Sequence, residues 1–327
     1  MKFNFAIIGF GSAGAKHLKT LIDNNINCNI YVISSRKHKA NSENVFYLND
    51  IKEIKSININ LVFICSSPSN HFKDLLICQK FFGKNVYYLI EKPITNNFAT
   101  LIKNIKNIKI KHSNIFVGYQ IQYSGGYNKI KKMIKNLYSK NILHIESVCE
   151  SYLPHWRTNR PFKYGNSLNY ENGGVLLELS HEINYLISLF GVPKKVYATN
   201  QINKLFKSKV DENVSANLIF KNGKVVNLYL NFDNKFYKKR LLELRTNDEI
   251  LTWNLINNEV INKTIKNVKK YKFKSEDTLL SLQLKFILGV INKKIKNNNS
   301  FKLAVETMRT IHYLKKSFNN NKVYKIE

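Results

Sequence analysis

The chain of 327 residues is longer than one hydrophobic core usually supports, so its length predicts two domains. Its 44% hydrophobic and 12% aromatic content is enough to fill such cores and excludes an intrinsically disordered protein. The 52 Lys and Arg residues exceed the 22 Asp and Glu residues, and this net charge of +30 is spread along the whole chain. The positive charge indicates attraction of anionic ligands. Its even spread along the chain argues against a specific nucleic-acid binder.

Short apolar runs alternate with helical stretches from residue 3 to about residue 118. The runs read FNFAIIGF, NIYVIS, NVFYL, NLVFICSS, NVYYLIE and NIFVGY, and helical stretches such as GAKHLKTLIDNN and NHFKDLLICQKFF lie between them. Strands that are apolar on both faces and separated by helices predict a parallel sheet covered on both sides. We therefore expect an α/β domain over residues 1–120.

The pattern changes after about residue 140, where HIESVCESY, VSANLIF, VVNLYLNF and KRLLELRT read as strands. The turn KNGK at 221–224 predicts a hairpin. NGGVLLELSHEINYLISLFG predicts one helix that ends at Gly191, and further helices are expected over 276–292 and 301–319. An α+β domain with a mostly antiparallel sheet is therefore expected over residues 121–327.

The sequence GFGSAG at 9–14 has the GxGxxG spacing and lies between the first predicted strand and the first predicted helix. In that position the first glycine permits a tight turn, the second lets the backbone approach a pyrophosphate, and the third packs the helix on the strand. The motif predicts a dinucleotide site. The loop residues expected to bind the cofactor are Gly9, Phe10, Gly11, Ser12, Ala13 and Gly14.

The end of the second strand, VISSRKHK, indicates which dinucleotide binds. NAD sites usually carry a carboxylate here for the ribose hydroxyl groups, and this stretch has none. Ser34 and Ser35 suit hydrogen bonds to a 2′-phosphate, and Arg36 and Lys37 suit its charge. We expect NADP in preference to NAD; the alternative is that Arg36 and Lys37 are ordinary solvated charges.

The four cysteines lie far apart without CxxC spacing, which predicts neither a metal site nor a disulfide framework and fits reduced thiols in a cytoplasm. The first apolar run is too short for a signal peptide. No stretch approaches the roughly 18 apolar residues that cross a membrane, so no membrane partner is expected.

The motifs GFGSAGAKH, SSPSNH and EKP, in this order, resemble those of the Gfo/Idh/MocA oxidoreductases, and NGGVLLELSHEIN resembles the family's glycine-rich helix. The resemblance covers nearly the whole chain. It implies a Rossmann domain followed by an open, mainly antiparallel α+β domain whose sheet often serves in oligomer contacts, hence a homo-oligomer, dimer or tetramer. Members mostly oxidise or reduce a sugar or cyclitol at a carbinol carbon with NAD or NADP.

Glu91, Lys92 and Pro93 match the family's EKP and follow a predicted Rossmann strand, where such folds bind ligands. The resemblance implies that Lys92 reaches the reacting hydroxyl and the nicotinamide ribose, and it places Glu91 beside the cofactor. An ammonium there stabilises a developing alkoxide. Without the other motifs, the same three residues also fit an ordinary strand exit.

The resemblance makes His181 the general base in oxidation and the acid in reduction. Glu178 precedes His181 by three residues and, on one helix, shares its face, so it is expected to orient the imidazole. Many members carry Asp at this site, commonly four residues before the histidine. The alternative for His181 is a structural histidine on an apolar helix.

The stretch SSPSNH resembles the family's cofactor-contacting loop, and it implies contacts from Ser66, Pro68, Asn70 and His71. Asn70 or His71 is expected to begin the next helix, and a purely helical role is the alternative for His71. Gln120 is expected near the nicotinamide. Gln122 stands where many members carry Arg, which puts substrate contacts from that strand in doubt.

The polar and aromatic stretch ESYLPHWRTNRPFKYG at 150–165 precedes the catalytic helix and is similar to members associated with bacterial surface-sugar pathways. Trp156 offers a flat face to a sugar ring, and Arg157 and Arg160 suit carboxylate or phosphate. The alternative is a surface loop with buried aromatic anchors. With Lys92 and His181, Trp156 and Arg157 are the expected substrate-binding residues.

The resulting hypothesis is an NAD(P)-dependent oxidoreductase that transfers hydride to or from a sugar, nucleotide sugar or cyclitol, without a metal. The alternative is a catalytically silent dinucleotide-binding protein that acts as a redox sensor or assembly subunit.

Overall fold

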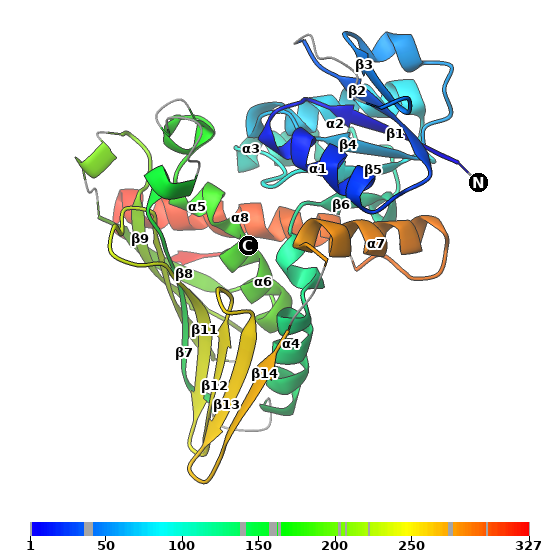
Figure 1. Ribbon diagram of the computed structural model, residues 1–327. Helices are drawn as coiled ribbons and strands as arrows, with labels where there is room; N and C mark the ends of the chain where they lie inside the picture. Colours follow the sequence, from blue (N-terminus) through cyan, green and yellow to red (C-terminus); the bar gives the residue numbers. More distant parts are fainter. Residues whose placement is uncertain are drawn as a thin grey trace. The chain divides into compact units, whose positions relative to one another are not determined.

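The computed structural model describes residues 2–35, 42–137, 142–156, 162, 165–201, 204–206, 208–221, 223–273, 277–298 and 300–326 (Figure 1). The chain forms two compact units. The first comprises residues 1–120 and 277–305, and the second comprises residues 121–276 and 306–327.

A six-stranded parallel sheet forms the centre of the first unit, in the order β3-β2-β1-β4-β5-β6. This order is the doubly wound dinucleotide-binding arrangement, which confirms the predicted Rossmann domain. Both faces of β4 are buried, as its LVFI sequence requires. The strands are β1 Phe3–Ile8, β2 Cys28–Ile33, β3 Val45–Leu48, β4 Leu61–Ile64, β5 Tyr87–Ile90 and β6 Ile115–Val117.

The helices of this unit have identifiable start and stop residues. In α2, Pro68 occupies the first turn, where its missing N–H costs nothing, and Gly83 ends the helix with a φ of +84°. The helix therefore begins at Pro68, before the expected Asn70 or His71. The helices are α1 Ser12–Asp23, α2 Pro68–Phe82, α3 Phe98–Ile105 and α7 Leu279–Ile291. Helix α8 (Ser300–Asn320) begins in this unit, and its residues from 306 onward belong to the second unit.

Helix α7 packs on the first sheet although it lies near the end of the sequence. Its Leu284, Ile287 and Val290 are buried in the same core as Phe5 and Ile7 of β1. The expected division, which assigned everything after residue 120 to the second domain, differs from this arrangement for residues 277–305. The physical reason is the apolar face of α7, which is covered by the first core.

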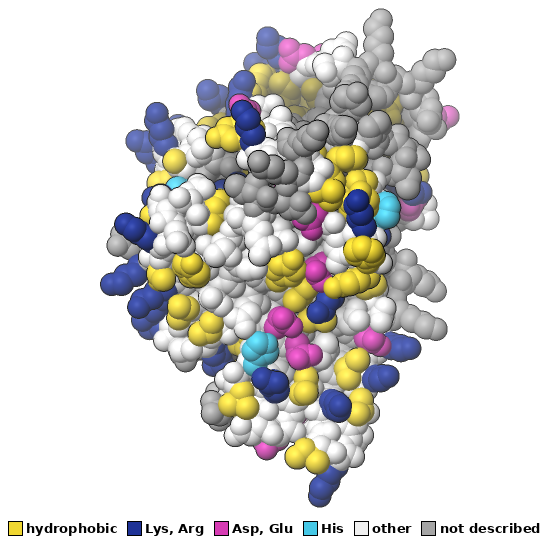
Figure 2. Space-filling model, turned by 90° about the vertical axis from the view of Figure 1, so that its left-hand side faces the viewer, with side chains coloured by type: hydrophobic (Ala, Val, Ile, Leu, Met, Phe, Trp, Pro, Cys, Tyr) yellow, Lys and Arg dark blue, Asp and Glu magenta, His cyan; other side chains and the backbone are white. Residues whose placement is uncertain are grey.

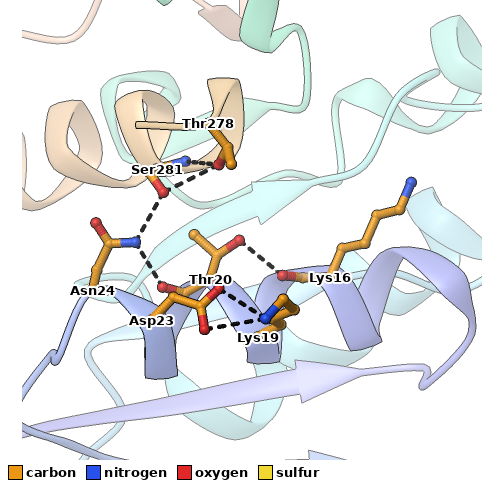
Figure 3. A network of polar contacts seen from close by, with 7 residues as sticks. All are labelled: Lys16, Lys19, Thr20, Asp23, Asn24, Thr278 and Ser281. Atoms are coloured by element: carbon orange, nitrogen blue, oxygen red, sulfur yellow. Dashed lines mark hydrogen bonds and ion pairs between the residues drawn. The ribbon is translucent and has the colours of Figure 1, made fainter. Parts of the chain in front are cut away.

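Hydrogen bonds join the two ends of this unit's sequence (Figure 3). The Asn24 side chain, just after α1, donates to Thr20 O at 2.8 Å and to Ser281 Oγ at 2.9 Å. Thr278 caps α7 by accepting a hydrogen bond from Ser281 N. The start of α7 is thereby fixed to the end of α1.

The edge strand β6 is also closed by side chains from the end of the sequence. Gln283 Nε2 donates to Val117 O at 3.1 Å, and Ser300 Oγ accepts from Val117 N at 3.0 Å. Asn297 Nδ2 donates to Ser113 O at 2.7 Å. Backbone groups that would be open to another strand are thus occupied.

The second unit contains a nine-stranded sheet in the order β14-β13-β12-β11-β7-β10-β9-β8-β15. The β7–β10 pair is parallel and the other pairs are antiparallel, so the sheet is mixed but mainly antiparallel. The hairpin predicted at KNGK joins β9 to β10. The strands are β7 Ile142–Glu150, β8 Lys195–Asn200, β9 Asn213–Ile219, β10 Val225–Asn231, β11 Lys239–Thr246, β12 Glu249–Asn254, β13 Glu259–Thr264, β14 Val268–Lys272 and β15 Tyr324–Lys325.

Helices α4 (Gly125–Leu137) and α6 (Ser180–Phe190) lie on one side of this sheet (Figure 1). The single helix predicted over NGGVLLELSHEINYLISLFG is wrong in one respect, because α5 (Val175–Glu178) and α6 are separate helices. Leu179 interrupts them with φ and ψ of −99° and 26°. Gly191 ends α6 with a φ of +89°, as predicted.

Basic side chains are scattered among acidic and hydrophobic ones on the face shown in Figure 2. They form no single stripe on that face, which agrees with the even spread of lysine along the sequence. Within the described residues, no helix is long and apolar enough to cross a membrane.

Candidate active site

The glycine motif connects β1 to α1 and packs against the loop that follows β4. Gly9 has a φ of +87°, and a Cβ on it would lie 2.8 Å from Ser66 N. A Cβ on Gly14 would lie 2.4 Å from Gly9 O. Side chains are excluded at Gly9 by backbone conformation and at Gly14 by the close approach of helix and strand.

Gly11 precedes the first turn of α1 and borders open space. A Cβ on Gly11 would have no atom within 4 Å. In α1 no side chain caps this end, and no acidic residue occupies the first turn. The free N–H groups and the positive end of the helix dipole suit an anion, so these residues fit the pyrophosphate of a dinucleotide.

Ser34 and Ser35 follow β2 at the same end of the sheet. Ser34 N donates to Leu48 O at 3.0 Å, which extends the pairing of β2 with β3, and Ser35 is exposed. Arg36 and Lys37, on which the expected NADP preference also depends, lie outside the described residues.

The loop after β4 is fixed by a serine and a histidine. Ser66 Oγ donates to Asp74 Oδ2 at 2.6 Å. The ring of His71 is buried, with Nδ1 2.8 Å from Pro93 O and Nε2 2.9 Å from Ser66 O. Burial lowers the pKa of His71, against the opposing influence of both carbonyls and of the Glu91 and Asp74 carboxylates. Pro68 and Asn70 lie in the first turn of α2, where Asn70 is exposed.

The Glu91 carboxylate at the end of β5 contacts a histidine that the sequence analysis did not select. His17 Nε2 of α1 lies 2.6 Å from Glu91 Oε1, and both side chains are largely buried. A Cβ on Gly118 would lie 2.9 Å from Glu91 Oε2, so a larger residue at position 118 would displace this carboxylate. Burial by itself would raise the pKa of Glu91, but the bond to His17 and nearby positive charge hold that pKa below its usual value.

A signal for His17 was present in GFGSAGAKH. His17 follows Gly14 by three residues, so on a helix it shares the face that packs on the strands. A polar side chain on that face needs a polar partner in the core, and Glu91 is that partner.

Lys92 and Pro93 form the turn that leaves β5. The peptide bond between them is cis, and Lys92 N donates to Glu91 Oε2 at 3.2 Å. Lys92 is half-buried at the carboxyl end of the sheet, the end at which folds of this kind bind ligands. Gln120 follows β6 at the same end, and its Oε1 has no hydrogen-bond partner among the described residues.

In the second unit, Glu178 ends α5 and His181 is the second residue of α6. Because Leu179 interrupts the helix, their spacing no longer places them on one face of a continuous helix. Glu178 Oε1 accepts a hydrogen bond from Ser167 Oγ at 2.8 Å. His181 is half-buried, and its proton-transfer role stays a prediction.

A buried ion pair fixes α6 to the sheet directly beside His181. Arg240 Nε of β11 donates to Glu182 Oε1 at 2.6 Å, and Glu182 is fully buried. Burial would lower the pKa of Arg240, but Glu182 raises it above its usual range, so the guanidinium stays charged. The sequence signal was a carboxylate within a largely apolar helix, and its partner was not predictable.

An amide network lies on the same helix. Gln122 Nε2 donates to Asn184 Oδ1, and Asn184 Nδ2 donates to Thr307 Oγ1 at 2.9 Å. The residue found where many members of the resembled family carry Arg is therefore bound to a neutral amide.

Trp156 lies in a cluster of aromatic rings. Its Nε1 donates to Ser151 Oγ at 3.0 Å, and its ring packs edge-on against Phe232 at a centroid distance of 6.1 Å. Phe206 packs on Phe232 and Tyr152. These contacts favour the buried-anchor alternative, and a sugar contact by Trp156 stays a prediction. Arg157 and Arg160 lie outside the described residues.

Metal ligands do not gather in the part of the chain that the structure describes: no three His, Cys, Asp or Glu side chains there are arranged to hold an ion. The four cysteines are unpaired and buried.

The sheet order, the glycine loop and the charged turn at the adjacent strand ends define a two-unit, dinucleotide-binding α/β protein. Residues 3–119 match the oxidoreductase family with an NAD-binding Rossmann fold, and residues 127–248 match the GFO/IDH/MocA C-terminal domain. The chain belongs to the Gfo/Idh/MocA family of oxidoreductases.

Individual relatives are distant. Myo-inositol 2-dehydrogenase of Thermotoga maritima is 28% identical over 140 residues, a match that spans 40% of each chain. Levoglucosan dehydrogenase in complex with NADH and levoglucosan superposes with a TM-score of 0.84 at 13% identity, over 100% of both chains. Myo-inositol 2-dehydrogenase of Lactobacillus plantarum superposes with a TM-score of 0.81 at 16% identity, again over 100% of both. At these identities the two structures show a common fold.

Proposed function

We propose that the chain is an NADP-preferring dehydrogenase or reductase that acts on a CH–OH carbon of a sugar, nucleotide sugar or cyclitol. The observation that carries the proposal is found at the carboxyl ends of the first unit's strands. Open space borders Gly11 after β1, and a turn held by hydrogen bonds carries Lys92 after β5. Relatives named for inositol and levoglucosan support the substrate class. A step in surface-sugar synthesis would suit this chemistry.

The bound dinucleotide supplies or accepts the hydride, and the chain's residues orient the reactants and move the proton. Lys92 places an ammonium at the end of β5, where it stabilises negative charge developing on the substrate oxygen. His181 takes the hydroxyl proton in oxidation and returns it in reduction. Glu178 is assigned to orienting His181.

The cofactor contacts are assigned to the loops that follow the strands. Pyrophosphate binding belongs to the glycine loop, and the 2′-phosphate belongs to Ser34, Ser35, Arg36 and Lys37. The nicotinamide half is assigned to the residues after β4, β5 and β6, namely Ser66, Pro68, Asn70, Glu91, Lys92 and Gln120. The assignment of His71 is limited to its backbone, because main-chain carbonyls occupy both nitrogens of its ring. Substrate binding is assigned to Lys92, His181, Trp156 and Arg157.

A catalytically silent dinucleotide-binding subunit is the second candidate. Two observations favour it: Glu178 is engaged by Ser167, and Gln122 is bound to an amide where many members carry Arg. It predicts cofactor binding without turnover.

We also propose that the chain forms a homo-oligomer, a dimer or tetramer, whose subunits contact one another through the open face of the nine-stranded sheet. Leu241 and Tyr229 alternate along their strands with the fully buried Leu242 and Leu230, so they lie on the face away from the core.

The four unpaired cysteines support a reducing cytoplasm.

The test is a fluorescence titration of the purified protein with NADPH and NADH, followed by addition of myo-inositol, levoglucosan, hexoses and nucleotide sugars. Binding with cofactor turnover by one substrate class is expected. Gly11→Val is the variant that blocks the site. Its side chain fills the open space without straining the backbone, so binding of NADPH and NADH should be lost while the melting temperature stays unchanged. Binding without turnover would favour the silent subunit, and no binding to the wild type would overturn the dinucleotide site.

A further inference from the structure

The ring of His71 links two main-chain carbonyls from different strand ends. Its Nε2 lies 2.9 Å from Ser66 O, after β4, and its Nδ1 lies 2.8 Å from Pro93 O, after β5. His71 is only 1% exposed, so water does not replace either partner. With both nitrogens engaged by the backbone, the ring has no further nitrogen for a cofactor.

Carbonyl oxygens only accept hydrogen bonds, so each of these contacts requires an N–H on the ring. A neutral imidazole carries one N–H and an imidazolium carries two. Burial is the largest influence on the ring and lowers the pKa of His71, whereas the two carbonyls and the carboxylates of Glu91 and Asp74 act in the opposite direction and favour the imidazolium. Glu91 is in turn paired with His17 from α1.

Lys92 lies between the two fixed points of this arrangement. On one side, its own N–H donates to Glu91 Oε2 at 3.2 Å. On the other side, the carbonyl of the next residue, Pro93, is bound by His71. The backbone that carries the Lys92 side chain is therefore held before and after the residue.

We propose that His71 is a positioning residue for Lys92: its ring clamps Pro93 O to Ser66 O and so fixes the turn relative to the loop after β4. The clamp has two hydrogen bonds when the ring is doubly protonated and one when it is neutral. The expected effect of the clamp on catalysis rests on the function proposed above. Its expected effect on the rigidity of the Lys92 turn does not.

The test compares His71→Gln with His312→Gln, the same substitution in α8 of the other part of the chain, using cofactor-free protein. NMR hydrogen exchange of the Lys92 amide reads out the turn directly. We expect the protection factor of this amide to fall about tenfold in His71→Gln, as on losing one buried hydrogen bond, and to stay within about twofold in His312→Gln. An unchanged protection factor in a folded His71→Gln protein would overturn the proposal.

The pH dependence of the wild type provides the second readout and needs no variant. Nitrogen-15 NMR of the His71 ring shows whether one or both nitrogens carry a proton. As pH rises through this titration, Lys92 protection should fall, and in His71→Gln it should show no such step. A ring that titrates while Lys92 protection stays constant, or one that stays singly protonated throughout, would contradict the clamp.

Activity separates the clamp from the proposed function. With a substrate identified, His71→Gln should lower kcat about tenfold with little change in the Kd of NADPH, because the turn and not the glycine loop is loosened. If the wild type turns over no substrate, the proposed function fails, and the Lys92 exchange still decides the clamp.

Discussion

Glu91 shows how one carboxylate organises the turn at the end of β5. It accepts from the Lys92 backbone and pairs with His17 at 2.6 Å, and Gly118 provides the space it occupies. The turn is thereby held against α1, the helix that begins at the glycine loop. Glu91 therefore connects α1, whose start is the expected pyrophosphate site, to Lys92, the expected catalytic lysine.

Replacing Glu91 by Gln should change how stability depends on pH. The native pKa of Glu91 is lowered from 4.5, so its contribution is present above pH 4.5 and is lost as pH falls through the native pKa. We expect Glu91→Gln to be about 1–3 kcal/mol less stable at pH 7 and its stability to vary less with pH in the acid range. Urea unfolding from pH 7 to pH 3 measures this, with exposed Glu171→Gln as the control; parallel curves for wild type and Glu91→Gln would contradict it.

At His181, removal of the imidazole should affect turnover and not cofactor binding. His181→Ala is expected to lose about 10²–10⁴-fold in kcat, the usual contribution of a general acid or base, with the Kd of NADPH unchanged. Steady-state kinetics and a binding titration measure the two quantities, with His312→Ala as the control. An active His181→Ala protein would remove the residue from the proposed proton transfer.

At Arg36, the expected effect discriminates between the two cofactors. Arg36→Ala should weaken NADPH about tenfold and NADH less than about twofold, because only NADPH carries the 2′-phosphate. Lys103→Ala, which removes the same charge from an exposed position on α3, controls for net charge. Equal losses for both cofactors would show that Arg36 does not read the 2′-phosphate.

At the scale of elements, α7 supports the first unit through its apolar face. Leu284→Ala should lower the free energy of unfolding by about 2–5 kcal/mol, since Leu284 is 4% exposed in the core that includes β1. Leu279→Ala on the same helix is the matched control, because Leu279 is 38% exposed. Denaturant unfolding compares the two variants, and equal losses would mean that α7 contributes little to the core.

The elements themselves were largely predictable. Apolar runs of strand length and glycine or proline at helix ends located β1 to β6, the β9–β10 hairpin and the end of α6. The interruption at Leu179 was not predictable, because Leu favours helices and nothing in VLLELSHE breaks the pattern. The start of α5 also depends on a distant residue, because Asp211 Oδ2 accepts a hydrogen bond from Leu176 N at 2.8 Å.

At the scale of the whole molecule, the net charge of +30 should produce weak, salt-sensitive attraction to polyanions. We expect binding of a DNA duplex at 50 mM salt to fall by at least about 10³-fold at 200 mM, while NADPH binding persists. Filter binding and the fluorescence titration measure the two at both salt concentrations. DNA affinity that survived 200 mM salt would point to a built nucleic-acid site.

The sequence by itself determined the parallel sheet, the glycine loop, the family and the candidate chemistry, because strand and helix periodicity and short motifs are local properties of a chain. Only the tertiary structure decided that residues 277–305 complete the first unit and that His17 pairs with Glu91. It also decided that His71 contacts main-chain carbonyls after β4 and β5, and that Arg240 forms an ion pair with Glu182. In each of these cases at least one partner is more than 20 residues away in sequence. Each buried polar or apolar group requires a partner, but which residue satisfies that requirement depends on how the chain packs.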